Sequence, residues 1–136
     1  MQLKRLTKMC VPILGVAALL TGCTSSGVTY SGLDGKAEAV DELPEIVQDS
    51  DAEIDVESAR FVGEQDGASV LLARGEQPDT VCLVASEADD WVVSCGAEGG
   101  PMTVAGEPGK YVVVPDGAPA PENATELSDN VYFITG

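Results

Sequence analysis

The chain has 136 residues, of which 23 are acidic, seven are basic and none is histidine, and its net charge at neutral pH is −16. Such a charge excludes a nucleic-acid-binding protein, because a strongly negative surface repels the phosphate backbone. The lack of histidine excludes Ser-His-Asp and Cys-His catalysis and histidine-ligated zinc.

The first segment of the chain has the pattern of an export signal. Lys4, Arg5 and Lys8 precede an apolar run over residues 9–20. A basic start followed by about 7–15 apolar residues is typical of a signal peptide. The run is shorter than the roughly 20 apolar residues that a membrane-spanning helix needs. We therefore interpret residues 1–22 as a signal peptide that is removed on export.

The end of this segment reads Leu20-Thr21-Gly22-Cys23 and resembles the lipobox of bacterial lipoproteins. The resemblance implies that a diacylglyceryl group is joined to the Cys23 thiol. A dedicated signal peptidase that recognises Leu20, Thr21 and Gly22 then cuts before Cys23. Two acyl chains give stable anchoring, at about 0.8 kcal/mol per buried CH₂. The expected location is therefore the extracytoplasmic face of the cell membrane, to which the lipid anchors the protein. The alternative is that residues 1–22 are an ordinary secretory signal and that the protein is released.

The mature chain, residues 23–136, carries all 23 acidic residues and only four basic ones, so its net charge is −19. This charge repels anionic lipid headgroups, and the acyl chains must therefore provide the contact with the membrane. Two interpretations of the acidity stay open, general solubility of an exported protein and binding of cations. We favour the first.

Residues 23–55 are predicted to form a flexible acidic tether. They begin with a Ser/Thr/Gly-rich stretch, and residues 34–57 contain ten acidic residues and one basic residue. Residues 36–43 can form a short helix that ends before Pro44, and residues 45–48 can add one turn.

The acidic run that begins at Asp49 matches an EF-hand calcium loop only at positions 1, 3 and 5. Positions 6 and 12 hold Ile54 and Arg60, where the loop needs glycine and glutamate. We therefore expect a solvated, self-repelling spacer and no metal site, with loose calcium association as the alternative.

Residues 56–136 are predicted to form the folded domain. Its first hairpin consists of the apolar runs 58–63 and 68–74, which flank Asp66-Gly67. An Asp-Gly pair between apolar runs is a strong signal for a type I′ turn.

A second hairpin joins strands 80–86 and 91–95 through a loop over residues 87–90. The pairing that this loop sets places Cys82 directly opposite Cys95. Both side chains then lie on the same face of the sheet, because strand side chains alternate between faces.

Cys82 and Cys95 are the cysteines that remain once Cys10 leaves with the signal peptide and Cys23 is lipidated. An even pair in an exported domain indicates a structural disulfide. A redox-active pair and a pair of metal ligands are the alternatives. Trp91 is expected to pack in the core or on this disulfide.

Further strands are predicted over residues 102–105, 110–114 and 130–135, with a proline-rich loop over 115–121. The total is six or seven strands with one or two helical turns. The expected fold is mainly β (or α+β), a small single-domain antiparallel sandwich or barrel-like sheet with a disulfide-linked hairpin.

The strand pair from Val81-Cys82-Leu83-Val84-Ala85 to Trp91-Val92-Val93-Ser94-Cys95 resembles small envelope proteins of actinobacteria. The similarity covers residues 61–95. It implies a β fold and no functional residues, because that group has no assigned activity.

The chain also has no glycine-rich phosphate loop, and with few aromatic residues it is poorly suited to build a sugar-binding cleft. We expect a non-catalytic envelope protein that needs no cofactor and binds another envelope protein or a wall component. The alternative is a small-ligand or cation-binding lipoprotein that serves a transporter. A pocket lined by converging carboxylates would favour this alternative or an enzyme, whereas a smooth domain with one exposed apolar patch would favour the first function.

Overall fold

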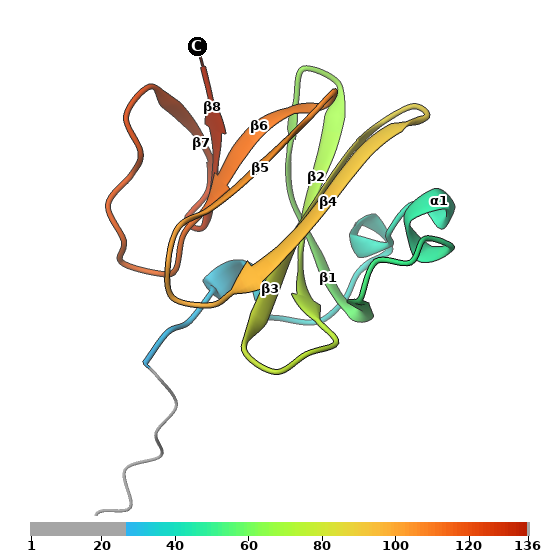
Figure 1. The fold of residues 1–136 in the computed structure, drawn as a ribbon, viewed down its shortest axis with the longest axis horizontal. Coiled ribbons are helices and arrows are strands. Elements are labelled where there is room, and N and C mark those ends of the chain that lie inside the picture. The colour runs from blue at the N-terminus through green and yellow to red at the C-terminus, as the bar shows by residue number, and fades with distance from the viewer. Residues whose placement is uncertain (1–26, 136) are drawn as a thin grey trace, which may run out of the picture.

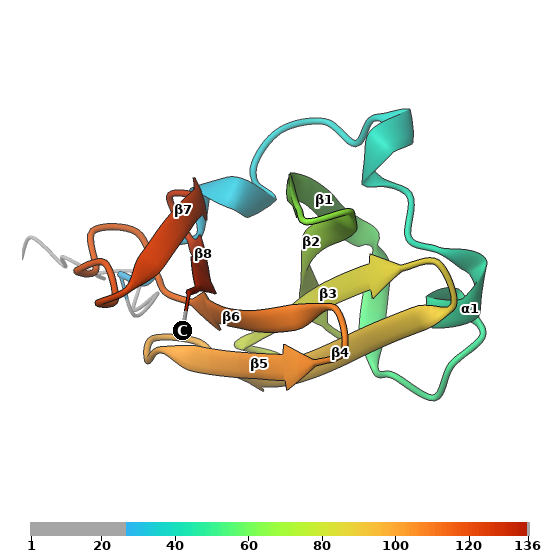
Figure 2. The same ribbon diagram turned by 90° about the horizontal axis from the view of Figure 1, so that it is seen from above.

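Eight antiparallel strands and three short helical segments make up residues 27–135, the part of the chain that the computed structural model describes. The predicted signal peptide and the lipobox with Cys23 lie outside these residues. The strands form two four-stranded sheets (Figures 1 and 2), which confirms the expected mainly-β sandwich. The elements are η1 (Ser31–Leu33), η2 (Ala39–Asp41), α1 (Glu45–Gln48), β1 (Ile54–Gln65), β2 (Ala68–Gly75), β3 (Thr80–Glu87), β4 (Asp90–Ala97), β5 (Met102–Gly106), β6 (Gly109–Val113), β7 (Ala124–Ser128) and β8 (Val131–Ile134).

The first sheet has the order β1-β2-β3-β4 and is a simple meander. Asp66 and Gly67 connect β1 to β2, and both have positive φ, 50° and 87°, as the predicted type I′ turn requires. In the next hairpin Cys82 pairs with Cys95, which confirms the predicted register. Its turn is tighter than expected, because Glu87 still pairs with Asp90.

The second sheet has the order β5-β6-β8-β7. The predicted strands at 102–105, 110–114 and 130–135 correspond to β5, β6 and β8. Strand β7 was not predicted, because its sequence Ala-Thr-Glu-Leu-Ser is mostly polar and lies at the edge of the sheet. It pairs with β8 through a bulge after Glu126.

The two sheets almost close into a barrel. Strand β5 runs beside β4 (Figure 2), and β7 lies beside β1, although neither pair is hydrogen-bonded in a shared sheet. Glycine permits the close approach of β5, since a Cβ atom on Gly106 would lie 2.9 Å from the Cβ of Val92. Each free sheet edge therefore faces an edge of the other sheet.

The space between the sheets holds the larger of two apolar cores, which we call the inner core. Tyr111 is fully buried in it, and its hydroxyl donates to the Pro108 carbonyl oxygen at 2.8 Å. The hydroxyl therefore adds no unpaired polar group to the interior. The buried members are Tyr30, Leu33, Val70, Leu72, Val81, Leu83, Ala85, Val104, Tyr111, Val113 and Val131.

A second core, which we call the outer core, lies on the opposite face of the first sheet. Strand β3 contributes to both cores, so its side chains from Val81 to Ser86 are all buried. The segment that contains η2 and α1 crosses this face and covers it. The buried members of the outer core are Leu43, Val47, Ile54, Ala59, Leu71, Ala73, Cys82 and Val84.

The expectation of a flexible tether over residues 23–55 is wrong for its described part. Tyr30 and Leu33 are buried in the inner core, and Leu43 and Val47 in the outer core. These four apolar residues are widely spaced within a polar, acidic stretch, so no periodic pattern indicates their burial. The folded unit therefore begins near Val28 rather than at residue 56.

Candidate functional site

A large bulge in β1 shapes the outer face of the first sheet. Asp55 pairs with Arg74 and Arg60 pairs with Leu72, so residues 56–59 lie opposite a single residue of β2. Ser58 stabilises the bulge, since its Oγ donates to the Asp55 carbonyl at 2.6 Å and accepts from the Arg74 amide at 2.8 Å. Bulges of this kind occur often at sheet edges and beside functional sites.

Arg60 ties the bulge to the segment before η2. One guanidinium nitrogen donates to the carbonyl oxygens of Glu57 and Ala59, at 3.0 and 2.8 Å. The other donates to the carbonyl oxygen of Gly35 at 3.0 Å. The Arg60 charge is thus used to satisfy backbone oxygens.

Asp41, at the end of η2, makes the matching contact from the covering segment. Its Oδ1 accepts from the Phe61 amide of β1 at 2.7 Å, and its Oδ2 accepts from the Glu38 amide at 2.7 Å. Together Asp41 and Arg60 fix the covering segment against the edge of β1 and leave a hollow beside it.

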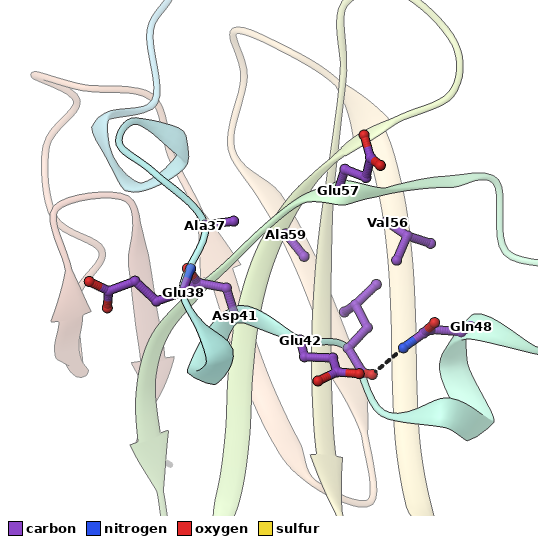
Figure 3. A pocket seen from close by; sticks show the side chains of 9 residues that line it. Ala37, Glu38, Asp41, Glu42, Gln48, Val56, Glu57 and Ala59 are labelled. Carbon is purple, nitrogen blue, oxygen red and sulfur yellow. Dashed lines mark hydrogen bonds between the residues drawn. The ribbon is translucent and has the colours of Figure 1, made fainter.

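This hollow is a cavity of about 270 Å³ between β1, η2 and α1 (Figure 3). Leu43 and Ala59 are buried and give it an apolar base. Gln48 closes one side, where its Nε2 donates to the Leu43 carbonyl oxygen at 2.6 Å. The residues that line the cavity are Ala37, Glu38, Asp41, Glu42, Leu43, Gln48, Val56, Glu57 and Ala59.

The charge at the cavity rim is negative, and no basic side chain of residues 27–135 forms an ion pair with it. Glu38, Glu42 and Glu57 are exposed, and each comes from a different part of the rim (Figure 3). Arg74 and Glu98, 3.1 Å apart, form the one ion pair found within residues 27–135. In this part of the chain no group of three acidic or cysteine side chains is arranged to hold a metal ion.

Exposed aliphatic side chains gather on the elements that frame the cavity. Four large apolar side chains are exposed within the described residues, and three of them are Val40 of η2, Ile46 of α1 and Val56 of β1, at 55%, 45% and 42%. We call the cavity, these three side chains and the three rim carboxylates the outer-face patch. It combines apolar surface with negative charge, as protein-binding surfaces often do.

The cysteine pair forms the predicted disulfide, with 2.01 Å between the sulfur atoms of Cys82 and Cys95. Cys82 is buried in the outer core, whereas Cys95 is exposed on the edge strand β4. Trp91 differs from the expectation of core packing, because it is 36% exposed and belongs to neither core. It pairs with Ser86 close to the hairpin turn.

A polar centre that the sequence analysis missed holds the start of the described chain. The side chain of Asn130 is fully buried, and it donates to the Val114 carbonyl and to Asp116 Oδ1 at 3.0 and 2.8 Å. Its own oxygen accepts from the Gly32 amide at 2.9 Å. No local pattern signals this contact, because it joins residues almost 100 positions apart.

Asp116 completes this centre. Its carboxylate accepts from the Thr29 hydroxyl at 2.7 Å and from the Ser31 amide at 3.0 Å, and its own amide donates to the Thr29 carbonyl. Desolvation raises the pKa of Asp116, but the hydrogen bonds from Ser31, Thr29 and Asn130 outweigh it and lower the pKa to about 2. We call Asp116 and Asn130 the clamp.

Comparison with known proteins assigns no relative. No protein-family model, no curated protein and no solved structure matches the chain significantly. Among the helices of residues 27–135, none is long and apolar enough to span a bilayer.

Proposed function

We propose that this protein is a lipid-anchored, non-catalytic protein of the extracytoplasmic membrane face that binds another envelope protein through the outer-face patch. The observation that carries the anchoring is the sequence Leu20-Thr21-Gly22-Cys23 after a basic and apolar export signal. The binding role is supported by the cavity and its exposed aliphatic rim. The non-catalytic role is supported by the sequence, which contains no histidine to act as a base near neutral pH.

The clamp supports a defined position of the domain relative to the anchor. Only residues 24–27 separate Cys23 from Val28, and a fully extended chain of that length spans about 17 Å. The clamp holds Thr29 and Ser31 on the second sheet. A lipid on Cys23 would therefore keep this end of the domain near the bilayer surface.

The outer-face patch lies away from that end. In both ribbon views, α1 and the start of the described chain are at opposite sides of the molecule (Figures 1 and 2). With the anchor on Cys23, the patch would face away from the lipid attachment point and be open to a partner.

The test of anchoring is the intact mass of the mature protein, made from the full precursor in a bacterium that processes lipoproteins. We expect a chain that starts at Cys23 and carries a diacylglyceryl group. Cys23→Ser serves as the control and should remain uncleaved and unlipidated. A wild-type chain without lipid, or with another first residue, would contradict the proposal.

A second candidate function is cation binding in support of a transporter. The carboxylates of Glu38, Glu42 and Glu57 line one cavity and give it the required charge, although no group of three within residues 27–135 is arranged to hold a metal ion. Oxygen ligands suit Ca²⁺, which takes six to eight of them. Calorimetric titration with Ca²⁺ separates the two candidates, because a cation site should give saturable binding that Glu57→Gln weakens.

A further inference from the structure

We propose that the outer-face patch binds a basic, amphipathic segment of a protein, in which lysine or arginine side chains alternate with apolar ones. The proposal rests on the proposed function and specifies the chemistry of the partner. Its basis is the cavity with its buried apolar base and the exposed aliphatic side chains on the elements around it. The negative charge of the lining carboxylates then decides which kind of partner fits.

The apolar part of the patch sets the first requirement on the occupant. Leu43 and Ala59 form the base of the cavity, and Val56, which also lines it, is exposed. Val40 of η2 and Ile46 of α1 are exposed on the elements that frame the cavity. A purely ionic partner would leave these side chains in water. A partner with its own apolar side chains removes this surface from water, at about 25 cal/mol per Å².

The charge of the patch sets the second requirement. Glu38, Glu42 and Glu57 line the cavity and form no ion pair within residues 27–135, whereas Asp41 and Arg60 are already used for backbone hydrogen bonds. Lysine and arginine can place their aliphatic stems on apolar surface and keep the charged group at the rim. The two requirements together describe a basic amphipathic segment.

The same charge excludes the other occupants of an apolar surface. A second copy of this chain brings a further net charge of −19 in its mature form. Anionic lipid headgroups and anionic wall polymers are repelled in the same way. A basic segment of a protein is the occupant that both the shape and the charge favour.

The experiment measures binding of synthetic peptides to the lipidated mature protein in detergent, by calorimetry at low and at physiological salt. The probe is a peptide of about 14 residues with lysine and leucine in helical spacing. One comparison peptide has glutamate in place of lysine, and a second has serine in place of leucine. We expect binding by the first peptide alone, and weaker binding at the higher salt concentration.

A matched pair of triple variants separates the patch from the general acidity of the protein. Glu38→Gln/Glu42→Gln/Glu57→Gln removes the rim charges, and the control removes three exposed carboxylates of the second-sheet region. The rim variant should weaken binding by about tenfold or more, and the control by less than about threefold. The control substitutions are Glu107→Gln, Glu122→Gln and Glu126→Gln.

Each remaining outcome overturns the proposal. Equal losses of peptide affinity in the rim variant and the control variant would mean that the net charge of the protein alone attracts the peptide. Equal binding of the serine peptide would mean that the apolar surface is not used, and equal binding of the glutamate peptide would mean that the rim charge is not used. Because intact mass reports lipidation independently, a failure of anchoring cannot be mistaken for a failure of peptide binding.

Discussion

The inner and outer cores are built from the two faces of the same sheet but are enclosed in different ways. The inner core is covered by a complete second sheet, whereas the outer core is covered by a thin segment in which Leu43 and Val47 are the buried side chains. Local opening costs least where few apolar contacts hold a segment. The outer-face patch therefore lies on the part of the fold that can adapt to a partner without unfolding the sandwich.

Two neighbouring leucines of β2 provide the most direct test of this difference. Leu72 is fully buried in the inner core, and Leu71 is 2% exposed in the outer core. We expect Leu72→Ala to lower the free energy of unfolding by about 3–5 kcal/mol and Leu71→Ala by about 2–3 kcal/mol, since the thin cover can collapse into the space left. Urea unfolding measures both values, and equal losses would show that the two cores are equally rigid.

Reduction of the disulfide tests how firmly the outer core is held together. Cys82 and Cys95 are 13 positions apart, and in the chain-entropy model closure of such a loop contributes about 3 kcal/mol. We expect Cys82→Ala/Cys95→Ala to lower the free energy of unfolding by about that amount. Thermal unfolding with and without reductant measures the effect, and the double variant should be insensitive to reductant.

Leu43→Ala tests whether the covering segment opens by itself. The substitution removes the apolar base of the cavity, and we expect it to lower the free energy of unfolding by about 2 kcal/mol. Hydrogen exchange should report a lower free energy of opening in residues 39–48 than in β3, whose amides open only with the whole domain, and the substitution should speed exchange in both regions. Equal free energies of opening in residues 39–48 and in β3 would contradict a separate outer unit.

The smallest effect is expected at the clamp, and it depends on pH. The pKa of Asp116 is lowered from 3.8 to about 2 in the folded protein, so the ionised carboxylate stabilises the fold above about pH 4. This contribution is lost as the pH falls through 2. Asp116→Asn should be less stable than the wild type at pH 6, and the difference should shrink towards pH 2. Urea unfolding monitored by circular dichroism measures both stabilities between pH 6 and pH 2. A difference in the free energy of unfolding that stays constant over this range would contradict the lowered pKa of Asp116.

Local sequence signals were sufficient for the centre of the fold. Asp66-Gly67 indicates the first turn, and the spacing of the second hairpin alone places Cys82 opposite Cys95. Both features depend on residues close in sequence, where turn chemistry and alternation of side chains dictate the result.

The parts that the sequence did not reveal depend on distant contacts. Tyr30 and Leu43 are single apolar residues in polar surroundings, and their burial follows from the sheet faces that they cover. The hydrogen bond from the Phe61 amide, just after the β1 bulge, to Asp41 joins segments 20 positions apart. The candidate cavity is formed by these contacts, so no local motif could indicate it.

The capping of β1 also has a consequence for how this protein avoids self-association. Open strand edges template pairing with another chain and can start aggregation. Here the Phe61 amide is occupied by Asp41, and the carbonyl oxygens of Glu57 and Ala59 are occupied by Arg60. These backbone groups are therefore not available to another copy of the protein, and this part of β1 cannot template an intermolecular β-sheet.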